Sequence, residues 1–206
     1  MKKLYLYAAA ALLLCYLLGS CNLSVMLSKA LGRDVRSAGS GNAGSTNMLR
    51  TFGWKAAIPV FLGDVAKGVI ATLFGIAVFA YCGYRARLGG YCGATACLLG
   101  HVFPVWFGFH GGKGIAICIG TIIALFPVGG TLILIFGLAV AGFSGYVSLG
   151  SILSAALFPI LALIRNGMRE FVPALIMCAL VIFFHRENIR RLIEHRENKF
   201  TPPKKK

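Results

Sequence analysis

Hydrophobic residues fill most of the chain, in runs separated by short polar segments rich in Gly, Ser, Asn and basic residues. A helix that crosses a bilayer needs about 20 mainly apolar residues. The apolar runs cover residues 4–21, 54–63, 65–83, 91–109, 114–128, 131–147, 148–164 and 171–184. We therefore predict an all-α integral membrane protein that crosses the bilayer several times.

The number of spans depends on Asp64, the only residue between the second and third runs. Merging these two runs into one long helix gives about seven transmembrane helices, with six or eight as alternatives. Several of them are short and glycine-rich, which favours close packing through small residues. Asp64 and Lys67 are three residues apart, and an intramembrane ion pair makes both charges tolerable. We expect this pair to support a site from behind.

Polar residues recur in four segments, 37–50, 100–114, 144–151 and 185–191. In the seven-helix arrangement all four emerge on the same side of the membrane. The sequence therefore predicts one site at the membrane surface, formed by polar loops on the cytoplasmic side.

Composition agrees with a membrane protein: the chain has 206 residues, is 58% hydrophobic and has a formal net charge of +15. The 21 Lys and Arg residues lie mostly at the ends of apolar runs, so no nucleic-acid partner is expected. The positive-inside rule places the N-terminus outside and the C-terminus in the cytoplasm. The basic residues after His185 decide this orientation.

We expect one transmembrane domain, residues 1–198, followed by a flexible basic tail, residues 199–206. The first apolar run ends at Cys21 and also resembles a lipoprotein signal, but a first membrane helix is the simpler interpretation. The seven cysteines form no C-x-x-C pair. We expect them to be buried small side chains.

The segment from Ser37 to Arg50 has the composition of an anion-binding loop. Small residues let the backbone turn tightly and direct several N–H groups to one point, and Arg50 adds a permanent positive charge. Those small residues are Gly39, Ser40, Gly41 and Gly44.

The second segment ends in Gly111, Gly112, Lys113 and Gly114, just before an apolar helix predicted from Ile115. Free N–H groups at a helix start favour a phosphate, and Lys113 adds a mobile charge. The spacing differs from that of nucleotide-binding P-loops, so ATP is not inferred. The alternative is a tight turn with a lysine that reaches the membrane surface.

The third segment places Ser148 and Ser151 nearly one helical turn apart, so both face the same side. Ligand contact is one interpretation of Ser148, and helix N-capping is the other. The same spacing lets His185 and Asn188, in the fourth segment, face one ligand. His185 is alternatively a simple interfacial residue.

Beyond that histidine, Arg190 and Arg191 are expected to meet lipid headgroups. An aspartate cluster that binds magnesium is missing, which argues against a phosphatidyl-group transferase. A carrier or channel for a phosphate-bearing solute needs polar residues through the bilayer, and only Asp64 and Lys67 interrupt the spans. That carrier remains the alternative function.

The four segments resemble those of the bacterial membrane glycerol-3-phosphate acyltransferases that use acyl phosphate as donor, over nearly the whole chain. The matching residues are Gly39-Ser40-Gly41-Asn42-Ala43-Gly44, Thr46-Asn47, Arg50, Asp64, Lys67-Gly68, Gly100-His101, Phe103-Pro104, Gly111-Gly112-Lys113-Gly114, Ser148-Leu149-Gly150-Ser151-Ile152, His185-Arg186-Glu187-Asn188-Ile189 and Arg191-Leu192. The resemblance implies transfer of a fatty acyl group to the 1-hydroxyl of sn-glycerol 3-phosphate, giving lysophosphatidate and inorganic phosphate. This reaction is the first step of phospholipid synthesis.

The resemblance also implies the site residues. Substrate-binding positions are Ser40, Gly41, Asn42, Asn47, Arg50, Gly111, Gly112, Lys113, Gly114, Ser148 and Ser151; catalytic positions are His185, Asn188 and Ser40; supporting positions are Asp64, Lys67 and His101. His185 is the candidate general base, and the rival acceptor of the proton is a substrate phosphate. His101 is expected to be a structural hydrogen-bond partner.

From the same resemblance we expect acyl phosphate, glycerol 3-phosphate and the lipid bilayer as partners, with an upstream enzyme that forms the acyl phosphate. No cofactor and no metal are expected. The implied location is the bacterial inner membrane. Three positions depart from the family by lacking a basic residue: His110, Gly145 and Phe184. A divergent inactive paralogue is therefore a further alternative.

Overall fold

The computed structural model describes residues 2–199, and all regular elements in this range are helices. They are α1 (Lys2–Ser20), α2 (Leu23–Ala30), η1 (Val35–Ser37), α3 (Ser45–Phe52), α4 (Trp54–Tyr81), α5 (Ala86–Val102), η2 (Val105–Phe107), α6 (Ile115–Leu125), α7 (Pro127–Ser144), α8 (Val147–Asn166), α9 (Met168–Phe184) and α10 (Arg186–Ile193). The expected basic tail lies outside the described residues, apart from Lys199.

Within the described range, five helical segments are long and apolar enough to cross a membrane: α1 with α2, α4, α5 with η2, α7 and α8. The pair α9 and α10, bent by 60°, makes a sixth. The remaining apolar helix, α6, has 11 residues. At about 1.5 Å per residue it spans only about half of the hydrocarbon core. The all-helical membrane fold is confirmed. The span predicted at 114–128 corresponds to α6, a short and largely buried helix.

The boundaries of two spans test the sequence interpretation directly. Asp64 does not break its helix, and α4 runs without interruption through 28 residues, as predicted. The run at 91–109 behaves differently, because α5 already ends at Val102. Pro104 follows two residues later, and a proline disfavours helical geometry in the residue before it. Residues 103–112 therefore form a turn, which includes η2 and lies at the end of this span.

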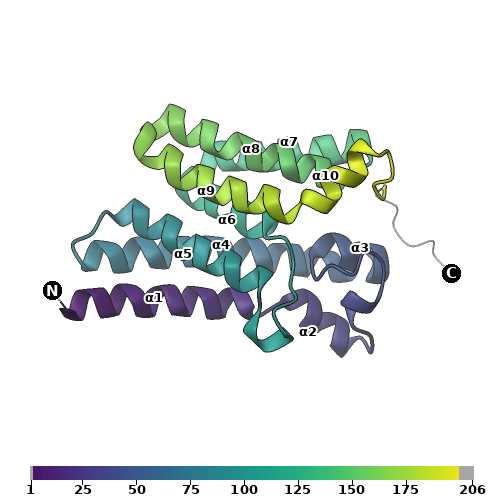
Figure 1. Cartoon of the computed structure of the whole chain (residues 1–206), viewed down its shortest axis with the longest axis horizontal. Coiled ribbons are helices and arrows are strands. Elements are labelled where there is room, and N and C mark those ends of the chain that lie inside the picture. The colour runs from purple at the N-terminus through teal and green to yellow at the C-terminus, as the bar shows by residue number, and fades with distance from the viewer. Residues whose placement is uncertain (1, 200–206) are drawn as a thin grey trace.

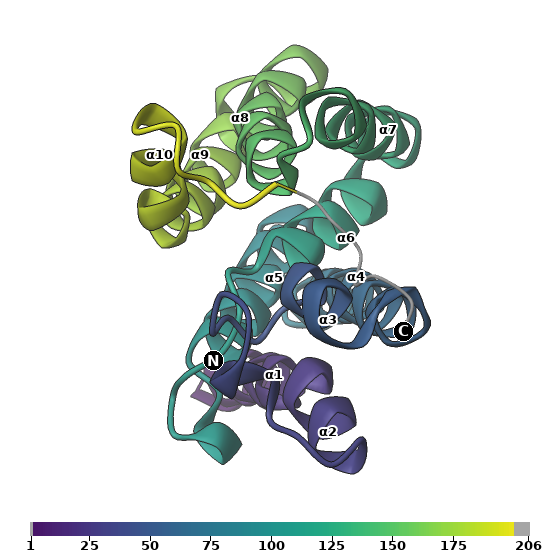
Figure 2. The same cartoon turned by 90° about the vertical axis from the view of Figure 1, so that its right-hand side faces the viewer.

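The helices form two layers with α6 between them (Figures 1 and 2). One layer contains α1, α4 and α5, and the other contains α7, α8 and α9. α4 packs against both α5 and α6, and α8 packs against both α7 and α9. The short helices α2, α3 and α10 all lie at one end of the bundle (Figure 1). The polar segments are thus gathered at that end.

Glycines allow the helices to approach closely. A Cβ added to Gly68 in α4 would lie 2.2 Å from the carbonyl oxygen of Ile117 in α6. A Cβ at Gly150 in α8 would lie 2.2 Å from the carbonyl oxygen of Gly137 in α7. Without a side chain, the two backbones meet directly, and the predicted packing through small residues is confirmed.

The predicted ion pair inside α4 is present. Lys67 Nζ lies 3.0 Å from Asp64 Oδ1, and the two side chains are only 7% and 3% exposed. Lys67 also donates to the carbonyl oxygen of Cys21, at the break between α1 and α2. The pair therefore ties the long α4 to the N-terminal helices.

The cysteines are largely as expected. Five are buried, namely Cys15, Cys82, Cys97, Cys118 and Cys178, and Cys92 is half-buried. Cys21 is exposed, so the expectation of burial is wrong there. It lies in the break between α1 and α2.

Candidate functional site

The four polar segments meet in one small pocket, with a volume of about 60 Å³, at the end of the bundle that carries α3 and α10. Its walls come from segments more than a hundred residues apart in the sequence. The lining residues are Ser40, Asn42, Gly44, Ser45, Thr46, Asn47, Arg50, Asp64, His101, Lys113, Gly114, Ile115, Ala116, Val147, Ser148, Ser151, His185, Asn188 and Glu197.

Three helices begin at the wall of this pocket. The first residues of α3, α6 and α8 line it, namely Ser45, Ile115 and Val147. The first turn of a helix leaves backbone N–H groups unpaired and carries the positive end of the helix dipole. Three such ends directed at one pocket favour an anion there. Of these three helix starts, only that of α6 was expected from the sequence to favour a phosphate.

Two basic side chains add charge to the pocket. Arg50, in the last turn of α3, donates through Nη2 to the carbonyl oxygen of Asn198 at 3.1 Å. Its Nε is buried and has no hydrogen-bond partner. A buried, unpaired donor on a cation is costly unless a ligand accepts from it. Arg50 is therefore the side chain best prepared to bind an anion.

Lys113 is the second cation. Its Nζ donates to Asn188 Oδ1, which connects the second polar segment with the fourth. Burial, helped by the positive charge of Arg191, lowers the pKa of Lys113 to about 8. The lysine is therefore mostly charged at pH 7 and becomes neutral as the pH rises through this value.

His185 and Asn188 face the pocket together, as their spacing predicted. His185 Nδ1 lies 2.7 Å from the carbonyl oxygen of Val181. Because a carbonyl only accepts, Nδ1 carries the proton and Nε2 of the neutral ring remains an acceptor. The imidazole thus offers a ligand Nε2 as an acceptor and no N–H group.

The sequence interpretation missed Glu197, which is buried in the pocket. Its carboxylate accepts from Ser148 Oγ at 3.1 Å, Asn188 Nδ2 at 2.8 Å and Arg191 Nε at 2.8 Å. Burial raises the pKa of Glu197, but these hydrogen bonds outweigh burial and hold it below its usual range. Glu197 therefore fixes Asn188 and Ser148 in place.

Two earlier interpretations change because of this carboxylate. Arg191 was expected to meet lipid headgroups, but it pairs with Glu197. Ser148 is not the N-cap of α8, since that position belongs to Tyr146. Ser148 faces the pocket and donates to Glu197, while Ser151 donates to the carbonyl oxygen of Val147. The only indication of this ion pair in the sequence was a glutamate that follows a basic helix.

Gly41, Gly111 and Gly112 were expected among the substrate-binding positions but do not line the pocket. Lys67, expected only to support the site from behind, also lies outside the pocket wall. The N–H groups of Gly111 and Gly112 donate to the carbonyl oxygens of Val102 and His101, so they are not free for a phosphate. A Cβ at Gly111 would lie 1.9 Å from the oxygen of His101. Gly111 and Gly112 therefore shape the turn, and their N–H groups are engaged within the protein.

Asn47 lines the pocket, but its amide is bonded to the first loop, residues 31–44 between α2 and α3. Oδ1 accepts from the N–H of Ser40 at 2.9 Å, and Nδ2 donates to the carbonyl oxygens of Val35 and Ala38 at 2.9 and 3.0 Å. Asn47 therefore sets the shape of the loop rather than binding a ligand through its amide. Ser40 and Asn42 remain on the pocket wall.

The supporting residues Asp64 and His101 lie at the inner wall of the pocket. His101 Nδ1 is 3.7 Å from Asp64 Oδ1 and makes no hydrogen bond. The hydrogen bond expected of His101 comes from its carbonyl oxygen, which accepts from Gly112 N–H at 3.1 Å. Asp64 therefore places a negative charge behind the cationic loops.

An apolar groove of about 320 Å³ adjoins the pocket and runs between α4, α6, α7 and α8. Ser45, Thr46, Ile115, Val147 and Ser151 line both spaces. The remaining wall is made mainly of side chains such as Ile58, Phe61, Ile119, Leu134 and Leu138. The arrangement suits a ligand with a charged head and an apolar tail.

The three positions that lack an expected basic residue all lie outside the pocket wall. His110 is exposed on the turn, Gly145 ends α7 in a left-handed conformation with φ of 78°, and Phe184 packs edge-on against Phe103. Within residues 2–199, no three His, Cys, Asp or Glu side chains are grouped as metal ligands are. The cations that line the pocket are thus unaffected by these departures.

Comparisons with known proteins agree over nearly the full length. The chain is 42% identical to a glycerol-3-phosphate acyltransferase of Thermoanaerobacter pseudethanolicus, covering 94% of this chain and 96% of that protein. It is 44% identical over 196 residues to one from Syntrophomonas wolfei, with 94% and 97% covered. It is 37% identical to one from Aquifex aeolicus, with 97% and 100% covered.

Solved structures give the same answer. A crystal structure of PlsY (YgiH), described as an integral membrane glycerol 3-phosphate acyltransferase in its glycerol 3-phosphate form, has a TM-score of 0.85 and 33% identity, covering 94% of this chain and 96% of that one. The lysophosphatidic acid form of PlsY has a TM-score of 0.82, with 94% and 95% covered. Residues 9–195 match the sequence profile described as Glycerol-3-phosphate acyltransferase. The chain therefore belongs to the glycerol-3-phosphate acyltransferase family.

Proposed function

We propose that this protein transfers a fatty acyl group from an acyl phosphate to the 1-hydroxyl of sn-glycerol 3-phosphate. The products are lysophosphatidate and inorganic phosphate. The observation that carries this proposal is the anionic-ligand pocket, with three helix starts and two cations, opening onto an apolar groove. PlsY, a relative with the same fold, is described with glycerol 3-phosphate and with lysophosphatidic acid.

The donor follows from the chemistry of the pocket. An acyl phosphate has a charged head for the pocket and a fatty chain for the groove, and it carries no nucleotide that would need a further binding surface. Phosphate is a good leaving group from a mixed anhydride, so the site has little need of a strong acid. Its main tasks are to orient the hydroxyl and to stabilise the oxyanion.

We assign the phosphates to Arg50, Lys113 and the helix starts, with Ser40, Asn42 and Ser151 as polar contacts. The glycerol oxygen attacks the acyl carbonyl carbon, and the carbon–oxygen bond to phosphate then breaks. His185 keeps its proton on Nδ1, so its Nε2 can accept a hydrogen bond from the glycerol hydroxyl. A substrate phosphate, with a second pKa near 6, accepts the hydroxyl proton. We therefore assign His185 and Asn188 to orienting the hydroxyl.

We further propose that the protein lies in the bacterial inner membrane with the pocket facing the cytoplasm and the N-terminus outside. The pocket end of the bundle carries basic residues from α2, α3 and α10, as the positive-inside rule requires of a cytoplasmic face. An enzyme that forms acyl phosphate would supply the donor on that side.

The function is tested with purified protein, palmitoyl phosphate and glycerol 3-phosphate. We expect lysophosphatidate and phosphate in equal amounts. Product from palmitoyl-CoA alone would exclude the proposed donor. No product from either donor would identify a divergent inactive paralogue. Uptake of glycerol 3-phosphate into proteoliposomes without product would favour the alternative, a carrier for a phosphate-bearing solute.

The pKa of Lys113 predicts a pH dependence. Because burial lowers this pKa to about 8, the charged form that attracts phosphate is lost as the pH rises through about 8. We expect a higher KM for the substrate whose phosphate is bound at Lys113. This KM should rise by up to about tenfold per pH unit above pH 8. Initial rates between pH 6.5 and 9.5, at saturating and limiting concentrations of each substrate, measure the effect.

The matched variant for this experiment is Lys113→Arg. A guanidinium stays charged throughout this pH range, so the rise in KM should disappear even if the overall activity is lower. The same rise in KM in both proteins would show that another group is responsible.

A further inference from the structure

We propose that Arg36 is a positioning residue that holds the turn at 103–112 against the first loop, and thereby sets the place of Lys113 for the substrate phosphate bound there. This inference rests on the proposed function. Arg36 does not line the pocket, and none of the sequence motifs used above includes it. Its effect therefore reaches the substrate only through the turn.

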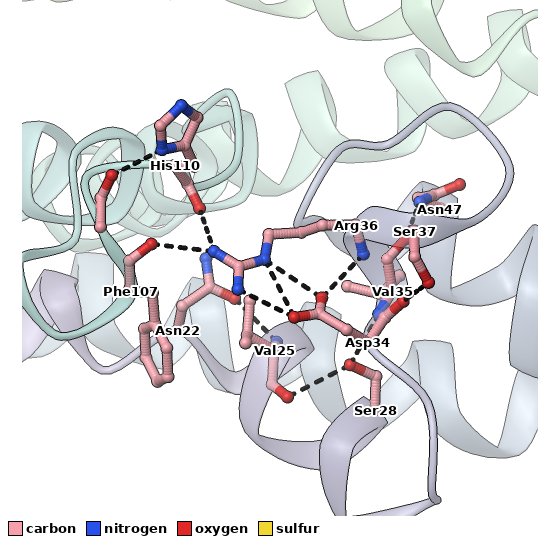
Figure 3. Close-up of polar contacts among 11 residues, drawn as sticks. Asn22, Val25, Ser28, Asp34, Val35, Arg36, Ser37, Asn47, Phe107 and His110 are labelled. Atoms are coloured by element: carbon pink, nitrogen blue, oxygen red, sulfur yellow. Dashed lines mark hydrogen bonds and ion pairs between the residues drawn. The ribbon is translucent and has the colours of Figure 1, made fainter.

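Asp34 holds the guanidinium group of Arg36 in a fixed orientation (Figure 3). Arg36 Nε lies 3.1 Å from Asp34 Oδ1, and Nη2 lies 2.8 Å from Oδ2. Asp34 also caps η1 by accepting from the backbone N–H of Arg36 at 2.9 Å. The hydrogen bond from Arg36 holds the pKa of Asp34 below its usual range, so the pair stays charged at neutral pH.

The remaining edge of the guanidinium group reaches across to the second polar segment (Figure 3). Arg36 Nη1 donates to the carbonyl oxygen of Phe107 at 2.8 Å and approaches that of His110 at 3.5 Å. These two carbonyls lie on either side of the tip of the turn. The guanidinium group of Arg36 thus binds both arms of the turn and connects them to the first loop.

Arg36 binds the turn next to its tip, where the backbone is irregular. Gly108 and Phe109 both have left-handed backbone conformations, with φ of 66° and 60°. The side chains of Trp106 and Phe109 are 61% and 55% exposed, so they add little packing to the turn. The backbones of the turn and the first loop are joined by a long hydrogen bond, from the N–H of Ala43 to the carbonyl oxygen of Gly111 at 3.4 Å.

Only arginine fits this position. It presents several N–H donors in a rigid plane, so it binds a carboxylate with one edge and carbonyls with another. A lysine carries a single ammonium group that cannot reach both partners in one geometry. Without these hydrogen bonds the turn would move more freely relative to the first loop. Lys113 lies three residues beyond His110, so it would move with the turn.

The test compares Arg36→Gln and Arg36→Lys with Arg33→Gln, a change at an exposed cation of the same loop. We expect Arg36→Gln to raise about tenfold the KM for the substrate whose phosphate lies at Lys113, the effect of losing one charged hydrogen bond, and to leave kcat within about twofold. Arg36→Lys should recover only part of the affinity. Arg33→Gln should leave both constants unchanged.

A second measurement separates positioning from general stability. Hydrogen exchange of the amides at 105–112 should become faster in Arg36→Gln, while exchange in α4 and α5 stays as in the parent protein. An unchanged KM for both substrates would overturn the inference. So would a general defect, in which kcat falls, KM rises equally for both substrates and hydrogen exchange becomes faster throughout the protein. Absence of transfer in the parent protein would instead overturn the proposed function.

Discussion

Arg50→Ala is expected to lower kcat/KM for acyl transfer by about a hundredfold to a thousandfold. Arg50 lines the pocket, its Nε is buried without a partner, and its Nη2 holds only a carbonyl oxygen. A contact between a charged donor and phosphate is worth about 1.5–3 kcal/mol, and the guanidinium group offers two such contacts. Steady-state kinetics with palmitoyl phosphate and glycerol 3-phosphate measure the loss.

Two variants control this experiment. Arg50→Lys keeps the charge but has no second donor edge, so an intermediate loss of about tenfold is expected. Lys55→Ala removes an exposed cation at the same end of the bundle and should have little effect. Activity of Arg50→Ala within threefold of the parent protein would show that the anion is bound elsewhere.

Asp64→Ala is expected to reduce the free energy of unfolding by about 3–5 kcal/mol, the usual cost of leaving one buried charge without its partner. Lys67 is 5% exposed, and without Asp64 its ammonium group retains only the carbonyl oxygen of Cys21. Unfolding in mixed micelles, followed by helical circular dichroism, measures the change. A lower thermal midpoint should accompany it.

The double variant Asp64→Leu with Lys67→Met is the matched control. It removes both charges and fills a similar volume with apolar groups, so most of the lost stability should return. If the single and double variants were equally unstable, the loss would come from packing around α4 and not from the unpaired ammonium group. The assignment of the pair as a structural support would then fail.

Much of the fold followed from the local sequence. The apolar runs predicted the helices because each run must satisfy its own backbone hydrogen bonds inside a membrane. Asp64 was correctly placed inside a continuous helix, since Lys67 one turn later is its partner. The end of α5 was placed too far along, because Phe103, Val105 and Trp106 are apolar and masked the helix-breaking effect of Pro104.

The sequence predicted that the four polar segments meet, but it did not show which backbone groups there stay free. The four segments converge, and Arg50, Lys113, His185 and Asn188 line one pocket as expected. Gly111 and Gly112 look like phosphate donors in sequence, yet the path of the turn commits their N–H groups to the end of α5. The backbone partners of a loop depend on its route through space, and the spacing of glycines does not encode that route.

Glu197 shows the same limit more clearly. The chain reverses at His195, where φ is 54°, and brings Glu197 back beneath α10 to accept from Ser148 and Asn188. Ser148 is 49 residues away in the sequence. No periodicity or motif relates these residues, so Arg191 was interpreted as a headgroup contact instead of the partner of this carboxylate.

The sequence by itself determined the membrane class, the helices and the chemistry available in each polar segment, because hydrophobic burial and residue type act locally. Only the tertiary structure decided which donors remain free. It directed the starts of α3, α6 and α8 at one pocket, engaged the amides of Gly111, Gly112 and Asn47, and left Arg50 Nε unpaired. A buried donor binds a ligand only when no nearer acceptor satisfies it, and the nearest acceptors here come from distant parts of the chain.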